Sequence, residues 1–213
     1  MGYNVAGAVV APNLRYLYAT SERYTAIGER QNTSEPCSEL KPGFFSIIDL
    51  QQLKTDPSRA HHDDIPTGYS PVCVRTSSDG EFVWVASRES NALLAYDGEK
   101  LHSSASLSAK NATGALLATV QVGTSPVDFI FARNETRILT TDSNRFHYPG
   151  AVTGLSVIDV QAALAGHGNT SMLGRIPTFE FPRDMALSPG GRTILVTQYT
   201  SGRIQAIDLD TLP

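Results

Sequence analysis

Three segments of this chain repeat one pattern of residues, and this repeat restricts the possible folds more than any other feature of the sequence. Each copy begins with a proline and ends with an aspartate, and the copies are Pro71–Asp97, Pro126–Asp159 and Pro182–Asp208. The prolines lie 55 and 56 residues apart, and the middle copy carries about seven extra residues around HYPGAVT. A looser fourth copy ends at Asp49, after a long insertion. A fixed period of this length is typical of stacked or radially arranged units.

Each copy contains the same series of short β-strands. FVWVAS, RILTTD and TILVTQ are rich in β-branched or aromatic residues, and small or polar turns (SSDGE, ARNET, SPGGR) precede them. A third strand ends at the aspartate, and an outer strand precedes the next proline, as in LLATVQV. Four antiparallel strands per unit indicate a β-propeller blade, whereas no segment keeps the 3.6-residue period of a helical solenoid. We therefore expect an all-β chain, a single propeller segment with about four four-stranded blades over residues 1–66, 67–122, 123–178 and 179–213.

The repeat resembles the YVTN-type repeat of lactonase-like propellers, which are related to the WD40-like propellers. The matching pieces are VGTSP, SSDG, SPGG, VTQY, SVID and QAID. The closing stretch from IPTFEF to DTLP is similar to the last blade of fungal secreted proteins named after lactonase and carboxymuconate cyclase. The resemblance implies a seven-bladed propeller about twice as long as this chain, with N-terminal blades and a leader peptide outside it. A closed four-bladed propeller is the alternative.

Composition and sequons bear on partners and compartment. The net charge of −4 gives no basic surface for nucleic acid, and no apolar run is long enough to span a membrane. Four N-glycosylation sequons occur where about 1.5 are expected by chance, and we expect exposed, glycosylated loops at Asn32, Asn111, Asn134 and Asn169. These favour an extracellular, secreted glycoprotein; chance occurrence in a Ser/Thr-rich cytosolic protein is the alternative.

The two cysteines, Cys37 and Cys73, lack the CxxC spacing of a metal or redox site. They lie in loops or strand ends of adjacent blades that we expect on one face, so a disulfide between them is a hypothesis. Two free thiols are the alternative.

Candidate site residues lie on the face that carries the proline loops and the loops between the second and third strands, because propeller sites gather around the central channel there. In the loop SNRFHYPG, Arg145 and His147 have the chemistry to bind a carboxylate or lactone carbonyl and to move a proton. Arg183 and Asp184 follow the last proline, and two interpretations are open: an ion pair at the channel mouth, or a local cap. Arg75 lies within an inner strand, where it needs a partner or a wet channel.

Other motifs indicate no cofactor or metal. We interpret His61–Asp64 as a solvated loop, because the flanking TDPSRA is loop-like. A metal site is disfavoured, because adjacent residues on a strand point to opposite faces and cannot easily bind one ion. Trp84 is the only tryptophan, and we expect it in the core. No GxSxG, P-loop or Rossmann motif is present. Two functions follow: a non-catalytic scaffold that binds a small molecule, carbohydrate or protein on the channel face, or a lactonase or cycloisomerase-type enzyme that uses the arginines and histidine above.

Overall fold

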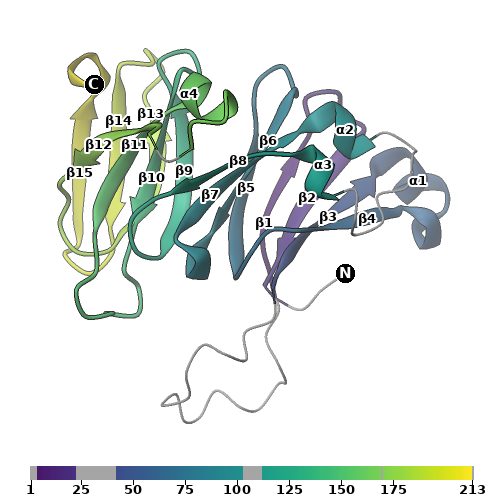
Figure 1. The fold of residues 1–213 in the computed structure, drawn as a ribbon, viewed down its shortest axis with the longest axis horizontal. Helices are drawn as coiled ribbons and strands as arrows, with labels where there is room; N and C mark the ends of the chain where they lie inside the picture. Colours follow the sequence, from purple (N-terminus) through teal and green to yellow (C-terminus); the bar gives the residue numbers. More distant parts are fainter. Residues whose placement is uncertain (1–3, 23–41, 103–111, 169, 213) are drawn as a thin grey trace, which may run out of the picture.

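A computed structural model describes residues 4–22, 42–102, 112–168 and 170–212, and these residues form four antiparallel sheets (Figure 1). Blade A consists of β1 (Val5–Val10), β2 (Tyr16–Ser21), β3 (Phe44–Asp49) and β4 (His61–Pro66). Blade B consists of β5 (Pro71–Thr76), β6 (Phe82–Ser87), β7 (Ala92–Asp97) and β8 (Leu116–Gln121). Blade C consists of β9 (Pro126–Ala132), β10 (Arg137–Asp142), β11 (Gly154–Asp159) and β12 (Met172–Ile176). Blade D consists of β13 (Pro182–Leu187), β14 (Thr193–Gln198) and β15 (Arg203–Asp208).

The sheets fan out one after another, with blades A and D at opposite ends (Figure 1). In each sheet the strands follow chain order, and the first strands lie side by side, β1 on β5, β5 on β9 and β9 on β13. These first strands are therefore the inner strands that face the channel. The all-β propeller fold expected from the repeat is confirmed, although blade D has three strands within the described residues.

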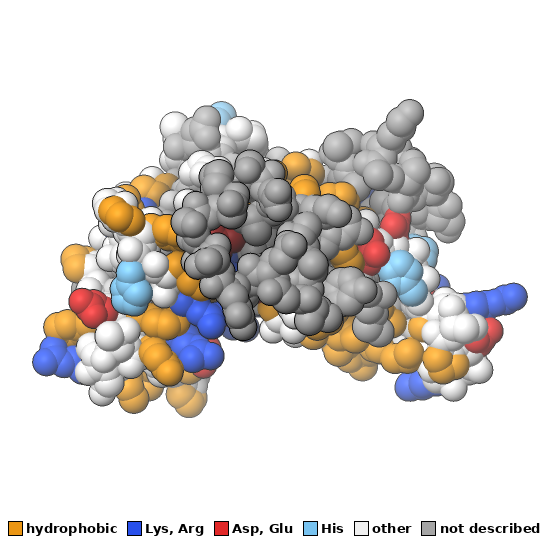
Figure 2. Space-filling model, turned by 90° about the horizontal axis from the view of Figure 1, so that it is seen from below, with side chains coloured by type: hydrophobic (Ala, Val, Ile, Leu, Met, Phe, Trp, Pro, Cys, Tyr) orange, Lys and Arg blue, Asp and Glu red, His pale blue; other side chains and the backbone are white. Residues whose placement is uncertain are grey.

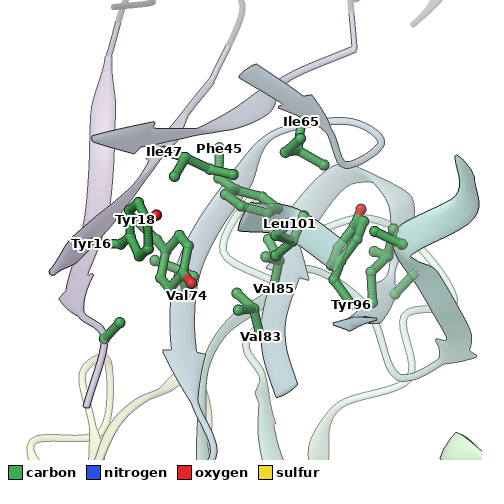
Figure 3. Close-up of a cluster of buried hydrophobic side chains, with 14 residues drawn as sticks. Tyr16, Tyr18, Phe45, Ile47, Ile65, Val74, Val83, Val85, Tyr96 and Leu101 are labelled. Carbon is green, nitrogen blue, oxygen red and sulfur yellow. The ribbon is translucent and has the colours of Figure 1, made fainter. Parts of the chain in front are cut away.

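Hydrophobic side chains fill each interface between neighbouring blades. Between blades A and B, Phe45 packs edge-on against Tyr18 and Tyr96, with ring centroids 5.8 and 5.3 Å apart (Figure 3). Trp84 is fully buried between blades B and C, in the core position expected for it. Leu139 and Ile194 belong to the third cluster, between blades C and D. The central strands β6, β10 and β11 are buried over most of their length, so the three clusters hold neighbouring sheets together.

The aspartate that closes each repeat is a helix cap. Asp49 accepts hydrogen bonds from the backbone N–H groups of Gln51 and Gln52, at the start of α1 (Leu50–Thr55). The equivalent aspartates begin α2 (Gly98–His102), α4 (Val160–Leu164) and the 3₁₀ turn at Leu209–Thr211. A carboxylate at this position satisfies N–H groups that the first helical turn leaves without partners. The repeat therefore fixes where each third strand ends. A further short helix, α3 (Ala112–Ala115), precedes β8.

A second repeated device fixes the inner strands. Each inner strand has a β-bulge near its start, and in blade C the Thr141 hydroxyl accepts from the Asp128 N–H (3.0 Å) and donates to its carbonyl (3.2 Å). Thr20 and Thr197 make the same pair of bonds in blades A and D. Blade B has Ala86 at this position. The bulge orients the side chain that follows the proline by two residues.

One sequence interpretation is wrong. His61–Asp64 belongs to strand β4 and not to a solvated loop. Since β4 is the outer strand of blade A, polar side chains are tolerated on it. His61 Nε2 lies 2.9 Å from an Asp64 oxygen, and the described residues contain no group of three or more His, Cys, Asp or Glu side chains placed to hold a metal. The described helices include none that is long and apolar enough to cross a membrane.

Candidate functional site

The channel mouth is formed by the loops that enter each inner strand and by those that join the second and third strands. Figure 2 views the molecule from this side: on the side of blades C and D, at left, Lys and Arg side chains lie beside hydrophobic ones. The ordered elements here include the 3₁₀ turn Arg88–Ser90 and the loop that follows β10. The sequence candidates were expected on this face, and the structure separates them into distinct clusters.

The inner strands of blades B and C carry an ion pair between them. Arg75 Nη2 on β5 donates to Asp128 Oδ1 on β9 at 2.9 Å, and the Arg75 guanidinium lies 5.9 Å from the centre of the Phe129 ring. The Arg75 side chain is 39% exposed, whereas that of Asp128 is 11% exposed. Burial acts to lower the pKa of Arg75, but the neighbouring Asp128 and Cys73 side chains together outweigh burial and raise it. Arg75 is therefore a half-exposed cation on an inner strand, with a carboxylate beside it.

Two polar atoms of this pair have no hydrogen-bond partner among the described residues. They are Asp128 Oδ2 and Arg75 Nε, and both atoms are buried. Leaving such a group without a partner costs about 1–3 kcal/mol. The pair thus combines a cation suited to an oxyanion with an oxygen suited to accept a proton.

Cys73 completes the cluster without adding a nucleophile. Its thiol lies 3.3 Å from Asp128 Oδ1 and donates to it. Burial, followed by the Asp128 charge, raises the pKa of the Cys73 thiol to about 12, so the reactive thiolate does not form near neutral pH. Cys73 carries a free thiol in the structure; Cys37 lies outside the described residues, so the bridge between them stays a hypothesis.

Arg88 lies at the mouth in a cluster that joins blades A, B and C. Its guanidinium donates two bonds to the Glu22 carboxylate, at 3.0 and 3.1 Å, and one to Glu89 at 3.2 Å. The Arg88 and Glu22 side chains are 5% and 9% exposed. Phe146 covers the guanidinium at 5.2 Å, and Tyr148 donates to the other Glu89 oxygen at 3.1 Å. Arg88 is therefore occupied within the protein and ties three blades together.

The loop that contains Arg145 and His147 folds onto itself. Asn144 accepts from the Tyr148 N–H at 2.8 Å, and the His147 N–H donates to the Asn144 carbonyl. Arg145 lies over the Phe146 ring at 5.6 Å, and both Arg145 and His147 are exposed. Among the described contacts, no hydrogen bond or ion pair joins His147 to the Arg75–Asp128 pair. The structure does not bring the two expected site residues of this loop to the inner strands.

Arg183 and Asp184 lie at the start of β13. The Arg183 guanidinium stacks over Tyr199 at 5.3 Å, and Asp184 accepts from the Met185 N–H at 3.0 Å. Among the described salt bridges, none joins Arg183 to Asp184, so the expected ion pair is not formed. Both side chains are exposed.

A buried carboxylate that the sequence analysis did not single out lies in blade C. Asp142 is fully buried and accepts from Thr140 (2.9 Å), Ser156 (2.7 Å) and Arg175 (3.4 Å). Gly123 passes so close that a Cβ there would collide with the carboxylate. Burial raises the pKa of Asp142 to about 6, against the lowering effect of its hydrogen bonds. Asp142 itself has no exposed surface, and its hydrogen-bond network joins three strands of blade C and the loop before it.

Of the expected glycosylation sites, Asn134 is exposed in the turn between β9 and β10. Asn32, Asn111 and Asn169 lie outside the described residues. Glycosylation at all four sites stays a prediction.

Asp128 is the site residue that the sequence analysis missed. It occupies the same repeat position as Cys73 and Asp184, two residues after the proline that begins each copy. Comparing the copies at this position, and looking for a basic residue on the neighbouring inner strand, would have paired it with Arg75.

Comparison with known proteins gives the fold. No protein-family model and no curated protein matches the sequence. Solved structures that match include Kuenenia stuttgartiensis hydrazine synthase, with a TM-score of 0.67 and 14% identity over 99% of this chain and 48% of that one. A putative 6-phosphogluconolactonase from Bacteroides uniformis matches with a TM-score of 0.65 and 14% identity, over 96% and 50%. The Pseudomonas aeruginosa periplasmic gluconolactonase PpgL matches with a TM-score of 0.61 and 16% identity, over 96% of this chain and 54% of that one.

These similarities concern architecture, since sequence identity is low throughout. The chain spans about half the length of each of these three structures. The neighbours are β-propeller proteins, and the four sheets described above have the same arrangement as part of their propellers.

Proposed function

We propose that this chain is part of a lactonase-type propeller that hydrolyses the lactone of a sugar acid at the inner strands of blades B and C. The observation that carries the proposal is the Arg75–Asp128 pair, whose buried Asp128 Oδ2 and Arg75 Nε have no partner among the described residues. Two of the similar structures bear lactonase names, one of them for a phosphorylated lactone. That likeness supports this enzyme over the non-catalytic scaffold.

The proposed chemistry assigns one role to each residue. Asp128 takes a proton from a water molecule, and the water oxygen attacks the lactone carbonyl carbon. Arg75 stabilises the negative charge that develops on the carbonyl oxygen. The carbonyl re-forms as the ring C–O bond breaks, and the ring oxygen takes the proton that Asp128 removed from the water, which gives the hydroxyl of the open acid and returns Asp128 to its carboxylate form. Cys73 keeps its proton and holds the Asp128 carboxylate in place.

Lactone hydrolysis releases acid, so a pH-stat assay with δ-gluconolactone and its 6-phosphate measures the activity directly. Asp128→Asn should lower kcat by about 10²-fold or more, the usual contribution of a general base. Arg75→Met should lower kcat for both lactones, because it removes the cation beside the oxygen on which negative charge develops. Asp97→Asn makes the same chemical change at a helix cap and should leave kcat unchanged. Wild-type protein that fails to accelerate either reaction, or an Asp128→Asn variant of full activity, refutes the proposal.

A second candidate is a non-catalytic binding protein with a carbohydrate or protein ligand on the mouth. The observation in its favour is the pair of exposed arginine–aromatic stacks, Arg145 on Phe146 and Arg183 on Tyr199, whose ring is 65% exposed. Such side chains are enriched in binding surfaces. Ligand binding that Arg183→Ala abolishes, in protein without lactonase activity, favours this candidate.

A further inference from the structure

We propose that a hollow between blades C and D, on the face opposite the channel mouth, binds a small hydroxylated anion such as a sugar acid. The hollow has a volume of about 530 Å³. Blade C supplies most of its polar lining, and the residues that matter here are Arg133, Asn134, Thr136, Arg137, Asp159 and Gln161. The proposal concerns a second site and does not depend on the lactone chemistry above.

The charges around the hollow leave one cation without a carboxylate. Arg137 is paired with Asp159 at 2.9 Å, and these side chains are 19% and 24% exposed, so they form the deeper part. Asp210, at the blade D side, is paired with Arg192 outside the lining. Arg133 has no salt bridge within the described part of the chain. The hollow therefore has room for one negative charge beside Arg133.

Neutral hydrogen-bonding groups surround this cation. No described residue bonds to the side-chain amide of Gln161, which offers both donors and an acceptor. The only described hydrogen bond of the Arg133 guanidinium is the one from Nη1 to the Leu212 carbonyl, at 3.1 Å, which leaves N–H groups for a ligand. An arginine with nearby amides matches a ligand that carries a carboxylate together with hydroxyl groups.

The turn that presents these groups is held at several points. Thr136 donates to the Arg133 carbonyl at 2.8 Å, and Glu135 accepts from the Ser78 N–H in blade B at 2.9 Å. Arg133 itself is anchored to blade D through Leu212. A site whose backbone is already fixed loses less conformational entropy when a ligand binds.

The equivalent hollow between blades A and B provides an internal contrast. It has the corresponding turns of those blades but a volume of about 180 Å³, and its charged lining consists of Asp79, Glu81 and Glu99, with His102 beside them. An anion is repelled by that set of carboxylates. We therefore expect the hollow between blades C and D to bind an anion, and the equivalent hollow between blades A and B not to do so.

Isothermal titration calorimetry of the full chain, produced without glycosylation, tests the proposal. D-Glucuronate is the probe, D-glucose supplies the hydroxyls without the charge, and acetate supplies the charge without the hydroxyls. Glucuronate should bind more tightly than either control. Arg133→Gln should weaken glucuronate about tenfold or more, as expected for the loss of a charged hydrogen bond, and Arg133→Lys should retain part of the affinity.

Two further variants separate this site from the channel. Gln161→Ala should weaken glucuronate without changing the fold, which urea denaturation checks for every variant. Arg75→Met should leave glucuronate binding at the hollow unchanged even if it alters lactone hydrolysis. The proposal is overturned if glucuronate does not bind, if glucose or acetate binds equally well, or if folded Arg133→Gln binds with wild-type affinity.

Discussion

Replacing Arg88 with methionine should strongly destabilise the protein, because Arg88 is the centre of a buried ionic cluster. The substitution removes the two bonds to Glu22, the bond to Glu89 and the stacking on Phe146. The Glu22 carboxylate, 9% exposed, then stays buried without its guanidinium. Removing one partner of such a pair costs about 3–5 kcal/mol.

The buried Trp84 gives a direct assay. It is the only tryptophan and lies between blades B and C, so its fluorescence follows unfolding in urea. With a denaturant slope of about 2 kcal/mol/M, a loss of about 3–5 kcal/mol lowers the midpoint by about 1.5–2.5 M. Arg88→Lys keeps the positive charge but loses the forked geometry of the guanidinium, so its urea midpoint should lie between those of wild type and Arg88→Met.

A double-mutant cycle identifies the cause. Glu22→Gln removes the charge that Arg88→Met leaves behind, so the double variant should be more stable than the sum of the single losses predicts, with a coupling of about 2 kcal/mol or more. The reasoning is refuted if Arg88→Met shifts the midpoint by less than about 0.5 M, or if the two losses simply add.

Four further outcomes are expected. Thr141→Val should lower the free energy of unfolding by about 1–3 kcal/mol in urea denaturation, because it deprives the buried Asp128 N–H of its acceptor. A midpoint equal to that of wild type contradicts a stabilising role for the Thr141–Asp128 hydrogen bonds. The Cys73 thiol should resist a thiol reagent in the folded protein and react once unfolded, because burial raises its pKa to about 12; rapid labelling of the folded chain excludes this. Burial and nearby positive charge lower the pKa of His102 to about 4, so the unfolded chain binds the proton first and stability should fall as pH drops from about 6.5 to about 4; His102→Gln should flatten that part of the curve, and an unchanged slope argues against it. In a eukaryotic secretory host, Asn134→Gln should remove one endoglycosidase-sensitive mass increment, and an unchanged mass shows that this sequon is not used.

The blades could be predicted from the sequence because their determinants are local. A proline, a short strand, a turn with small residues and a closing aspartate lie within about 30 residues of one another in each copy, and each acts on its own neighbours. The sequence shows that an aspartate closes each copy, but only the structure shows that this aspartate caps a helix. The loop interpretation of His61–Asp64 was wrong because the turn-like TDPSRA before it does not continue into these residues, which form an outer strand that exposes one edge and tolerates polar side chains.

The side-chain clusters could not be predicted in the same way, because they form between blades. Arg88 meets Glu22 across 66 residues of sequence and Arg75 meets Asp128 across 53. Which side chains meet depends on the rotation between neighbouring sheets, which the strand pattern leaves open. The Tyr18 hydroxyl oxygen and His102 Nε2 likewise lie 2.6 Å apart although the two residues are separated by 84 positions in the sequence.

The repeat nevertheless explains why the Arg75–Asp128 pair occurs at one blade interface and not at the next. The bulge gives each inner strand the same geometry, so the residue two places after the proline can contact the residue four places after the proline of the preceding blade. At the B–C interface these are Asp128 and Arg75. At the C–D interface the equivalents are Asp184 and Ile130, and an isoleucine offers the carboxylate no charge, so Asp184 turns to the N–H of its own neighbour instead. A single basic residue on one inner strand is thus enough to turn a repeated structural position into a polar site, while the backbone around it stays that of an ordinary blade.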